Sequence, residues 1–232
     1  MQSTAIISPD MTDEMRSSLK AHNIEPVILP RTDRIAVPVS GHPDMQIFIH
    51  ADTLFCHPDI DSSFLKKVDS RINIVQCGTR LSSTYPGDIP YNIACTGGAA
   101  FHRTDATEPF IRKYLNDSSV ELVHVRQGYS RCSSCIISPE ALITADRGIH
   151  QKAMEHGLAS LLIEPGHVAL PGYRYGLIGG ASGMTGDTVF FTGTVRGHPD
   201  YLRIMEFIEN SGKGVVFLSD DPAIDLGSIL IF

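Results

Sequence analysis

A repeated succession of helix and strand is the feature of this sequence that most limits how the chain can fold. Five helix starts recur along the chain, each with a capping side chain, a proline or a carboxylate near the first turn. They predict helices over residues 12–22, 59–68, 107–116, 147–157 and 199–211. An apolar strand is expected after each helix, over residues 26–29, 72–75, 121–125, 161–163 and 214–218. Internal repetition of this kind constrains the whole fold, so it is considered before any single motif.

Short β-rich segments open the later repeats and complete the pattern. We expect these first strands over residues 45–49, 99–102, 135–138 and 188–191. The chain then divides into five ββαβ-like units, the first of which lacks its second strand: residues 1–41, 42–94, 95–131, 132–180 and 181–232. Because closing such units into a ring removes exposed ends, we predict one α/β domain over residues 1–232, a five-fold α/β propeller. An ordinary two-layer or doubly wound α/β domain would show the same alternation and is the alternative.

Composition and charge exclude several classes of function. The chain has 19 Lys and Arg against 26 Asp and Glu, a formal net charge of −7, without a cluster of basic residues. Nucleic acids and anionic membranes are therefore not expected as partners, because phosphate binding needs concentrated positive charge. We find neither a signal peptide nor an apolar run of the roughly 18 residues that a membrane span needs. These features, with an odd count of 5 cysteines, indicate a reduced cytoplasmic protein.

The junctions that precede the first strands carry the reactive side chains. Counting back from those strands places His42, Cys95, Cys132 and Asp225 at comparable positions, and the fourth junction offers Gly180, Ser182 and Asp187. In a five-fold ring, equivalent positions face a common axis, so these residues should line a central channel. A histidine can lower the pKa of a nearby thiol, and a carboxylate can orient the histidine or bind a cationic substrate. We therefore expect a small-molecule ligand in this channel.

Three short motifs carry a resemblance to a known superfamily. His42-Pro43-Asp44 followed by an apolar strand resembles the His-x-Asp strand start of the guanidine-modifying, or pentein, superfamily. Asp225-Leu226-Gly227-Ser228 is similar to the acidic Gly-Gly turn of that superfamily, and residues 170–183 look like an uncharacterised branch of the same fold. Members of the superfamily include arginine and agmatine deiminases, amidinotransferases and dimethylarginine hydrolases. The resemblance covers essentially the whole chain and implies the five-unit pentein fold.

The resemblance also implies a chemistry, with one departure. The catalysts of the superfamily carry their nucleophilic cysteine in the last junction, where this chain has Ser228 and where no cysteine follows Cys135. Either the site is rotated around the ring, with Cys132 as nucleophile, or catalysis has been lost. The second case would leave a noncatalytic module that binds a protein or a small ligand. A Zn²⁺ site made by the histidine, cysteine and aspartate junction residues is a third hypothesis.

The leading hypothesis assigns a role to each junction residue. Cys132 would attack the amidino carbon of a guanidine- or amidine-bearing small molecule, and His42 would act as general acid and base. Asp44, Asp225 or Asp187 would bind the cation, while Cys95, Gly180, Ser182 and Ser228 would line the ligand site. This hydrolase or transferase chemistry requires no cofactor. The sequence is compatible with a homodimer.

Overall fold

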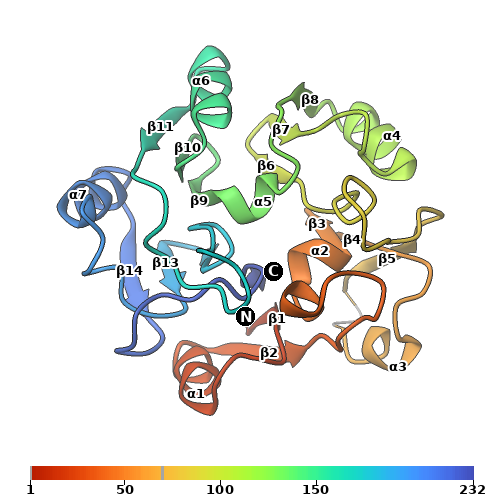
Figure 1. Ribbon diagram of the computed structural model, residues 1–232, viewed down its shortest axis with the longest axis horizontal. Helices are drawn as coiled ribbons and strands as arrows, with labels where there is room; N and C mark the ends of the chain where they lie inside the picture. Colours follow the sequence, from red (N-terminus) through yellow and green to blue (C-terminus); the bar gives the residue numbers. More distant parts are fainter. Residues whose placement is uncertain (1, 69–70) are drawn as a thin grey trace.

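The strands form a ring of small sheets. The computed structural model describes residues 2–68 and 71–232, and within these residues the strands make five three-stranded sheets arranged around a central axis (Figure 1). In four sheets the first and second strands pair antiparallel and the second and third pair parallel. Their strands are β3 (Ile47–His50), β4 (Thr53–Cys56), β5 (Asn73–Gln76), β6 (Ala94–Thr96), β7 (Ala99–His102), β8 (Glu121–His124), β9 (Ser134–Ser138), β10 (Ala141–Thr144), β11 (Ala159–Leu162), β12 (Ser182–Thr185), β13 (Thr188–Phe191) and β14 (Gly214–Phe217).

The remaining sheet joins the two ends of the chain. β1 (Ser3–Ile7) pairs parallel with β2 (Ile24–Ile28) and antiparallel with β15 (Leu230–Ile231). The N and C termini accordingly lie near each other close to the axis (Figure 1). The first unit lacks a strand of its own, but the missing strand is the first of its sheet, and not the second as we expected, because β15 pairs antiparallel with β1 as the first strands of the other sheets do with their second strands. This pairing closes the ring.

Five helices of the described residues lie on the outside of the ring and cover the sheets (Figure 1). They are α1 (Asp13–Ala21), α3 (Ser62–Leu65), α4 (Pro109–Asp117), α6 (Arg147–Glu155) and α7 (Tyr201–Asn210). Side chains cap the first four at their N-termini, because each accepts a bond from a backbone N–H that has no partner inside the helix. The capping residues are Thr12, Asp61, Glu108 and Asp146. The five helices predicted from these signals are confirmed, although α3 is shorter than expected.

The hydrophobic core is divided among the seams between neighbouring units. In one seam, Ile204 and Ile208 of α7 pack with Ile137 and Ile143 of the preceding sheet. The described residues form five such clusters, and each combines side chains from at least two adjacent units. Burial of each large aliphatic side chain contributes about 1.5–3 kcal/mol, so every unit depends on its neighbours for stability. Five closed seams confirm the predicted α/β ring and exclude the doubly wound alternative.

Short helices lie near the axis and correct part of the strand prediction. They are η1 (Val37–Val39), α2 (Pro43–Gln46) and α5 (Ser130–Ser133). The segment 45–49 begins as helix, since β3 starts only at Ile47. Residues 99–102 and 188–191 are the second strands of their sheets, because β6 and β12 precede them. Within the described residues, no helix is both long and apolar enough to span a membrane.

Candidate active site

Residues directly before the first strand of each sheet meet at the axis. Met45, Asn92, Cys132, Gly180 and Ser228 each stand two residues before β3, β6, β9, β12 and β15, respectively. The short helices α2 and α5 place two of these junctions, and Pro43 at the start of α2 fixes the backbone there. These positions lie together, because Asn92 contacts Met45 and Cys132, and Gly180 is hydrogen-bonded to the backbone of Cys132 and of Ser228. The residues found there differ in part from those expected.

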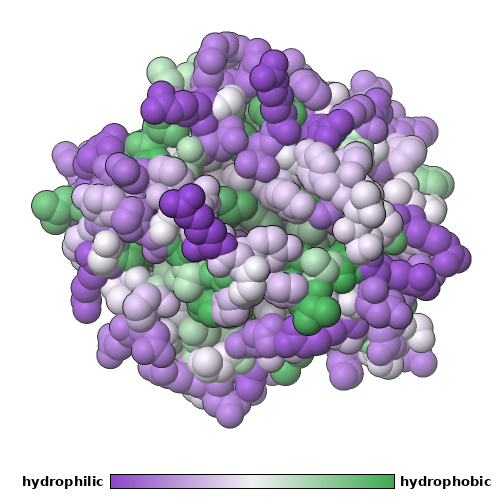
Figure 2. Space-filling view, in the orientation of Figure 1, coloured by the Kyte–Doolittle hydropathy of each residue, from purple (hydrophilic) through white to green (hydrophobic). Residues whose placement is uncertain are grey.

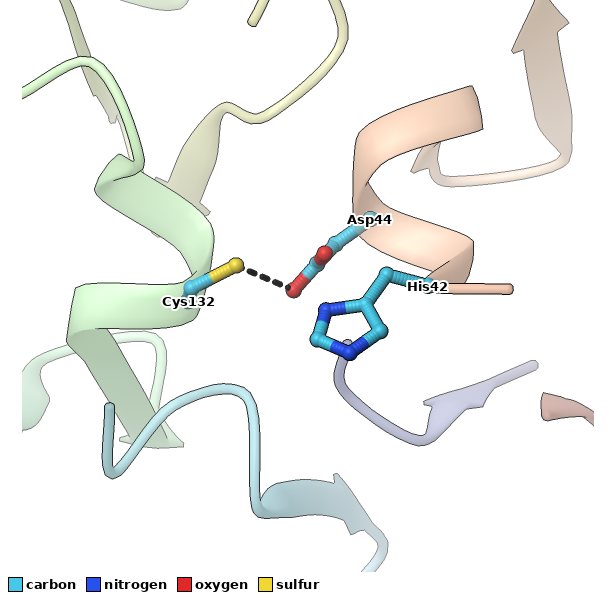
Figure 3. A group of neighbouring side chains, drawn as sticks. All are labelled: His42, Asp44 and Cys132. Atoms are coloured by element: carbon cyan, nitrogen blue, oxygen red, sulfur yellow. Dashed lines mark hydrogen bonds between the residues drawn. The ribbon is translucent and has the colours of Figure 1, made fainter. Parts of the chain in front are cut away.

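A cysteine, an aspartate and a histidine form the centre of the site (Figure 3). The Cys132 thiol of α5 donates a hydrogen bond of 3.1 Å to Asp44 Oδ2 of α2. A ring nitrogen of His42 lies within 4.8 Å of both the Cys132 sulfur and a carboxylate oxygen of Asp44. All three side chains are almost completely buried, at 2% exposure for His42, 1% for Asp44 and 4% for Cys132. Such a group can exchange protons over short distances while largely shielded from water.

Ser228 completes the hydrogen bonds to Asp44 from the opposite end of the chain. Its hydroxyl donates to Asp44 Oδ2 at 2.6 Å, and it also lies 3.1 Å from the Gly179 carbonyl oxygen. Asp44 Oδ2 thus accepts bonds from two donors, whereas Oδ1 has no partner among the described residues. The oxygen with two donors is the one placed to receive the thiol proton.

Asn92 holds Cys132 from the other side. Its amide Nδ2 donates to the Cys132 sulfur at 3.1 Å, and its Oδ1 accepts from the backbone N–H groups of Arg131 and Cys132 at 2.8 and 3.3 Å. The side chain is fully buried. Because an N–H donor favours the charged form of an acceptor, this contact opposes the effects that keep the thiol protonated.

A second aspartate lies beside His42. Asp225 Oδ1 is 3.7 Å from His42 Nδ1, and the Asp225 carboxylate accepts backbone bonds from Leu177 at 2.9 Å and Gly227 at 3.0 Å. Glycine is required at Gly180 because a Cβ there would collide with the Asp225 carboxylate. At Gly227, φ is +77° and a Cβ would collide with His42. The acidic, glycine-containing turn therefore packs directly against the histidine.

Burial and negative charge set the protonation of the site. Burial raises the pKa of Cys132 well above its usual value, and the nearby Asp44 and Asp225 carboxylates raise it further, while the Asn92 bond lowers it. Burial also raises the pKa of Asp225 to about 6, opposed by His42 and reinforced by Asp44. At neutral pH the resting site therefore holds a neutral thiol and an ionised Asp225.

A cavity gives access to this group. It has a volume of about 240 Å³, and its lining includes His42, Cys132 and Asp225 together with Tyr129, Tyr173 and Tyr175. Figure 2 shows hydrophobic residues around a hollow near the centre of this face of the molecule. We call this space the axial cavity. An apolar cavity with a few convergent polar groups is the usual form of a small-molecule site.

Three residues expected to line the ligand site lie elsewhere. Cys95 is inside β6 and lines a separate small cavity with Asp44, since the junction was counted from the second strand of its sheet. Asp187 lies in the tight turn between β12 and β13, where its side chain is 93% exposed and pairs with Lys213. Ser182 is buried within β12, 3.1 Å from the Gly179 carbonyl oxygen. His42, Asp44, Cys132, Gly180, Asp225 and Ser228 are brought together.

Sequence reasoning missed Asn92. The signal was available, because Asn92 precedes β6 by the same two residues that separate Cys132 from β9. We expected residues 99–102 to be the first strand of the third unit, whereas the first strand is β6, over residues 94–96. Counting back from the wrong strand therefore gave Cys95 as the junction residue.

The central group also has the composition of a metal site. Among the described residues, His42, Asp44 and Cys132 form the one group of three whose ligand atoms are close enough to share an ion. Imidazole, carboxylate and thiolate are all ligands of Zn²⁺. Each of the Cys132 and Ser228 donors already contacts Asp44 Oδ2, however, so an ion would have to displace the thiol proton.

Comparison with known proteins places the chain in a family. The model of a family of unknown function, DUF6873, matches residues 6–230. The chain belongs to the DUF6873 family. None of the curated proteins compared with this DUF6873 protein matches it in sequence.

Several solved structures share the fold of this DUF6873 protein. A mutant DDAH from Pseudomonas aeruginosa complexed with citrulline has a TM-score of 0.56 at 9% identity, over 94% of this chain and 91% of that one. SxtG, an amidinotransferase from Microseira wollei, has a TM-score of 0.55 at 9% identity, over 93% and 88%. Agmatine deiminase from C. jejuni has a TM-score of 0.54 at 9% identity, over 97% and 90%. These proteins have the pentein fold, so the DUF6873 protein shares that fold.

Proposed function

We propose that the protein is a cysteine-dependent enzyme that hydrolyses or transfers the amidino group of a guanidine- or amidine-bearing small molecule. One observation carries the proposal: the Cys132 thiol, the Asp44 carboxylate and a His42 nitrogen lie within 4.8 Å of one another. The axial cavity reaches His42 and Cys132, with Asp225 beside them. This arrangement supplies a nucleophile, a proton acceptor and a group that can protonate a leaving amine. The pentein fold of the neighbouring amidinotransferase and deiminase supports the same class of chemistry.

The charge of the substrate would activate the thiol. In the resting site the carboxylates of Asp44 and Asp225 raise the pKa of Cys132. A guanidinium or amidinium that lies beside Asp225 brings a positive charge close to the sulfur. At a separation of about 4 Å and an effective dielectric constant of about 20, that charge stabilises the thiolate by roughly 4 kcal/mol. The bound cation therefore lowers the thiol pKa, and the nucleophile forms only when a cation is bound.

The first half-reaction uses Asp44 and His42 as separate proton carriers. The thiol proton passes to Asp44 Oδ2, and the sulfur bonds to the amidino carbon while the C=N electron pair moves onto nitrogen. His42, which lies beside Asp225, acts as the general acid and gives a proton to the leaving amine as the C–N bond breaks. The product is a covalent S-amidino adduct on Cys132 and a free amine.

The second half-reaction restores the enzyme. Water, or an acceptor amine in a transfer reaction, attacks the adduct carbon and gives a proton to His42. The C–S bond breaks, the thiolate regains its proton from Asp44, and the protonated product releases a proton to solvent. Hydrolysis of a guanidine would therefore yield a urea and an amine, without a cofactor.

Mass spectrometry after treatment with 2-chloroacetamidine at neutral pH tests the proposal. The five cysteines are all free, so Cys56, Cys77, Cys95 and Cys135 serve as internal controls. Preferential labelling of Cys132, abolished in Cys132→Ser, is expected. Labelling without preference for Cys132 would overturn the nucleophile assignment. A noncatalytic binding module would instead bind guanidines reversibly without forming a covalent adduct.

A further inference from the structure

A second cavity adjoins the axial cavity and has no role in the steps above. Its volume is about 230 Å³, and Gln127, Tyr175 and Leu177 line both cavities. The Gln127 amide is fixed between them, because its Nε2 donates to Asp146 Oδ2 at 3.3 Å and its Oε1 accepts from the Tyr129 N–H at 3.1 Å. A ligand long enough to leave the axial cavity past Gln127 and Tyr175 would enter this second cavity, which we call the side cavity.

A buried hydroxyl without a partner lies in the wall of the side cavity. Ser133 is the neighbour of Cys132 on α5 and is only 3% exposed. Its Oγ has no hydrogen-bond partner among the described residues, and the residue lines the side cavity. Because a buried polar atom without a partner is costly, this hydroxyl indicates that a ligand group can bind there. Adjacent residues of one short helix thus face two neighbouring cavities.

Two acidic residues and two histidines, His167 and His198, line the side cavity. Asp146 and Glu164 line it, and Asp146 retains acceptor capacity after its bonds to Gln127 and to the Ile149 N–H. His198 adds no positive charge at neutral pH, because burial lowers its pKa. Its Nδ1 accepts from the Asp200 N–H, so its Nε2 donates to the Glu164 carbonyl oxygen. Within the described part of the chain, neither lysine nor arginine lines the axial cavity or the side cavity.

We propose that the side cavity is a second binding site for the tail of the substrate, and that it selects a tail bearing an ammonium or another N–H donor over one bearing a carboxylate. This inference rests on the proposed function, which places the amidino group in the axial cavity. The ammonium would donate to Ser133 Oγ and would lie near Asp146 and Glu164. A carboxylate in the same place would meet two like charges without a compensating cation.

Arg31 provides a possible binding site for a substrate tail of the opposite charge. It lines a third cavity that shares His42, Leu170 and Asp225 with the axial cavity. Arg31 is already paired with Asp10, so its charge is compensated. A substrate tail that turned towards Arg31 would carry a carboxylate, and the two directions predict opposite preferences.

Calorimetric titration with three compounds that share one head and one chain length separates these cases. The compounds are butylguanidine, 4-aminobutylguanidine and 4-guanidinobutanoate. We expect 4-aminobutylguanidine to bind the wild-type protein at least tenfold more tightly than butylguanidine, and 4-guanidinobutanoate to bind more weakly than both. Asp146→Asn preserves the helix cap, so an Asp146→Asn, Glu164→Gln double variant should lose most of the tenfold preference without weaker binding of butylguanidine. Ser133→Ala should lose part of it.

The relative affinities of the three compounds distinguish failure of the tail site from failure of the proposed function. Asp187→Asn, in the exposed hairpin turn, is the matched control and should leave all three affinities unchanged. Equal affinities for butylguanidine and 4-aminobutylguanidine would overturn the inference and leave the proposed function intact. Tighter binding of 4-guanidinobutanoate would also overturn it, in favour of the Arg31 side. Absence of binding by all three compounds would contradict the proposed function itself.

Discussion

Replacement of Asp44 by asparagine should make Cys132 more reactive towards neutral reagents while abolishing turnover. Asp44 Oδ2 accepts from the Cys132 thiol at 3.1 Å and from Ser228, and Oδ1 has no partner in the described structure. Asparagine can keep the accepting oxygen and place its Nδ2 where Oδ1 already lacks a partner. The substitution therefore removes a charge with little change of shape.

The size of the effect follows from the distance between the two groups. At 3.1 Å and an effective dielectric constant of about 20, the Asp44 charge destabilises the thiolate by roughly 5 kcal/mol. Its removal should therefore lower the Cys132 pKa and increase the fraction of thiolate at pH 7. Nucleophilicity falls as the thiol pKa falls, with a Brønsted coefficient of about 0.5, so the net gain in alkylation rate at pH 7 is about 100-fold.

The assay is the second-order rate of iodoacetamide labelling at Cys132, followed by mass spectrometry in wild type, Asp44→Asn and the exposed control Asp187→Asn. Iodoacetamide is neutral, so it reports thiolate formation without assistance from a cation. Turnover of any guanidine substrate should fall at least 100-fold in Asp44→Asn, because the thiol proton loses its acceptor. An alkylation rate in Asp44→Asn at or below that of wild type, in a variant with an unchanged Tm, would refute the electrostatic account.

Three further variants or conditions test neighbouring parts of the site. Asn92→Leu removes the hydrogen bond that the Asn92 amide donates to the thiolate, which is worth about 1.5–3 kcal/mol. Iodoacetamide labelling of Cys132 should therefore slow by about threefold to tenfold. A labelling rate equal to that of the wild type would show that Asn92 does not stabilise the thiolate. The pKa of Asp225 is raised to about 6, so its carboxyl group becomes neutral below that pH. The affinity for butylguanidine, measured by calorimetry, should therefore fall as the pH decreases from 7 to 5. An affinity that does not change with pH would show that Asp225 does not bind the cation. In Gly180→Ala the new Cβ would collide with the Asp225 carboxylate and displace it. Butylguanidine binding should then weaken at least tenfold. An unchanged affinity would show that displacement of the Asp225 carboxylate does not affect cation binding.

Much of the ring could be predicted from local signals. The caps Thr12, Glu108 and Asp146 mark helix starts because a side-chain acceptor satisfies exposed backbone N–H groups. Repetition of those signals gave the number of units, and the junctions gave His42, Cys132 and Asp225. The closing strand β15 has only two paired residues and joins opposite ends of the chain, so its partner in the first sheet could not be inferred from local pattern.

The errors concern short elements and the residues aligned on them. Helices α2 and α5 have four residues each, too few to show a helical period, so Met45 was assigned to a strand. In the third unit the three-residue strand β6 gave little signal, which made Cys95 the expected junction residue in place of Asn92. Asp187 was expected at a junction because it directly precedes residues 188–191, but these residues are the second strand of their sheet, so Asp187 lies in the exposed hairpin turn. A buried junction and an exposed turn differ in burial, which depends on the whole fold and is not evident from the local sequence.

The central claim is that a bound cation converts the neutral Cys132 thiol into a nucleophile. The most direct measurement compares the rates at which 2-chloroacetamidine and its neutral isostere 2-chloroacetamide alkylate Cys132 at pH 7, each divided by its rate with free cysteine. Stabilisation of the thiolate by roughly 4 kcal/mol, about half of it offset by the lower nucleophilicity of a more acidic thiol, corresponds to a rate advantage of at least tenfold for the amidine. The account predicts that advantage in the wild-type protein and its loss when excess butylguanidine occupies the site. Equal normalised rates for the two reagents would contradict it.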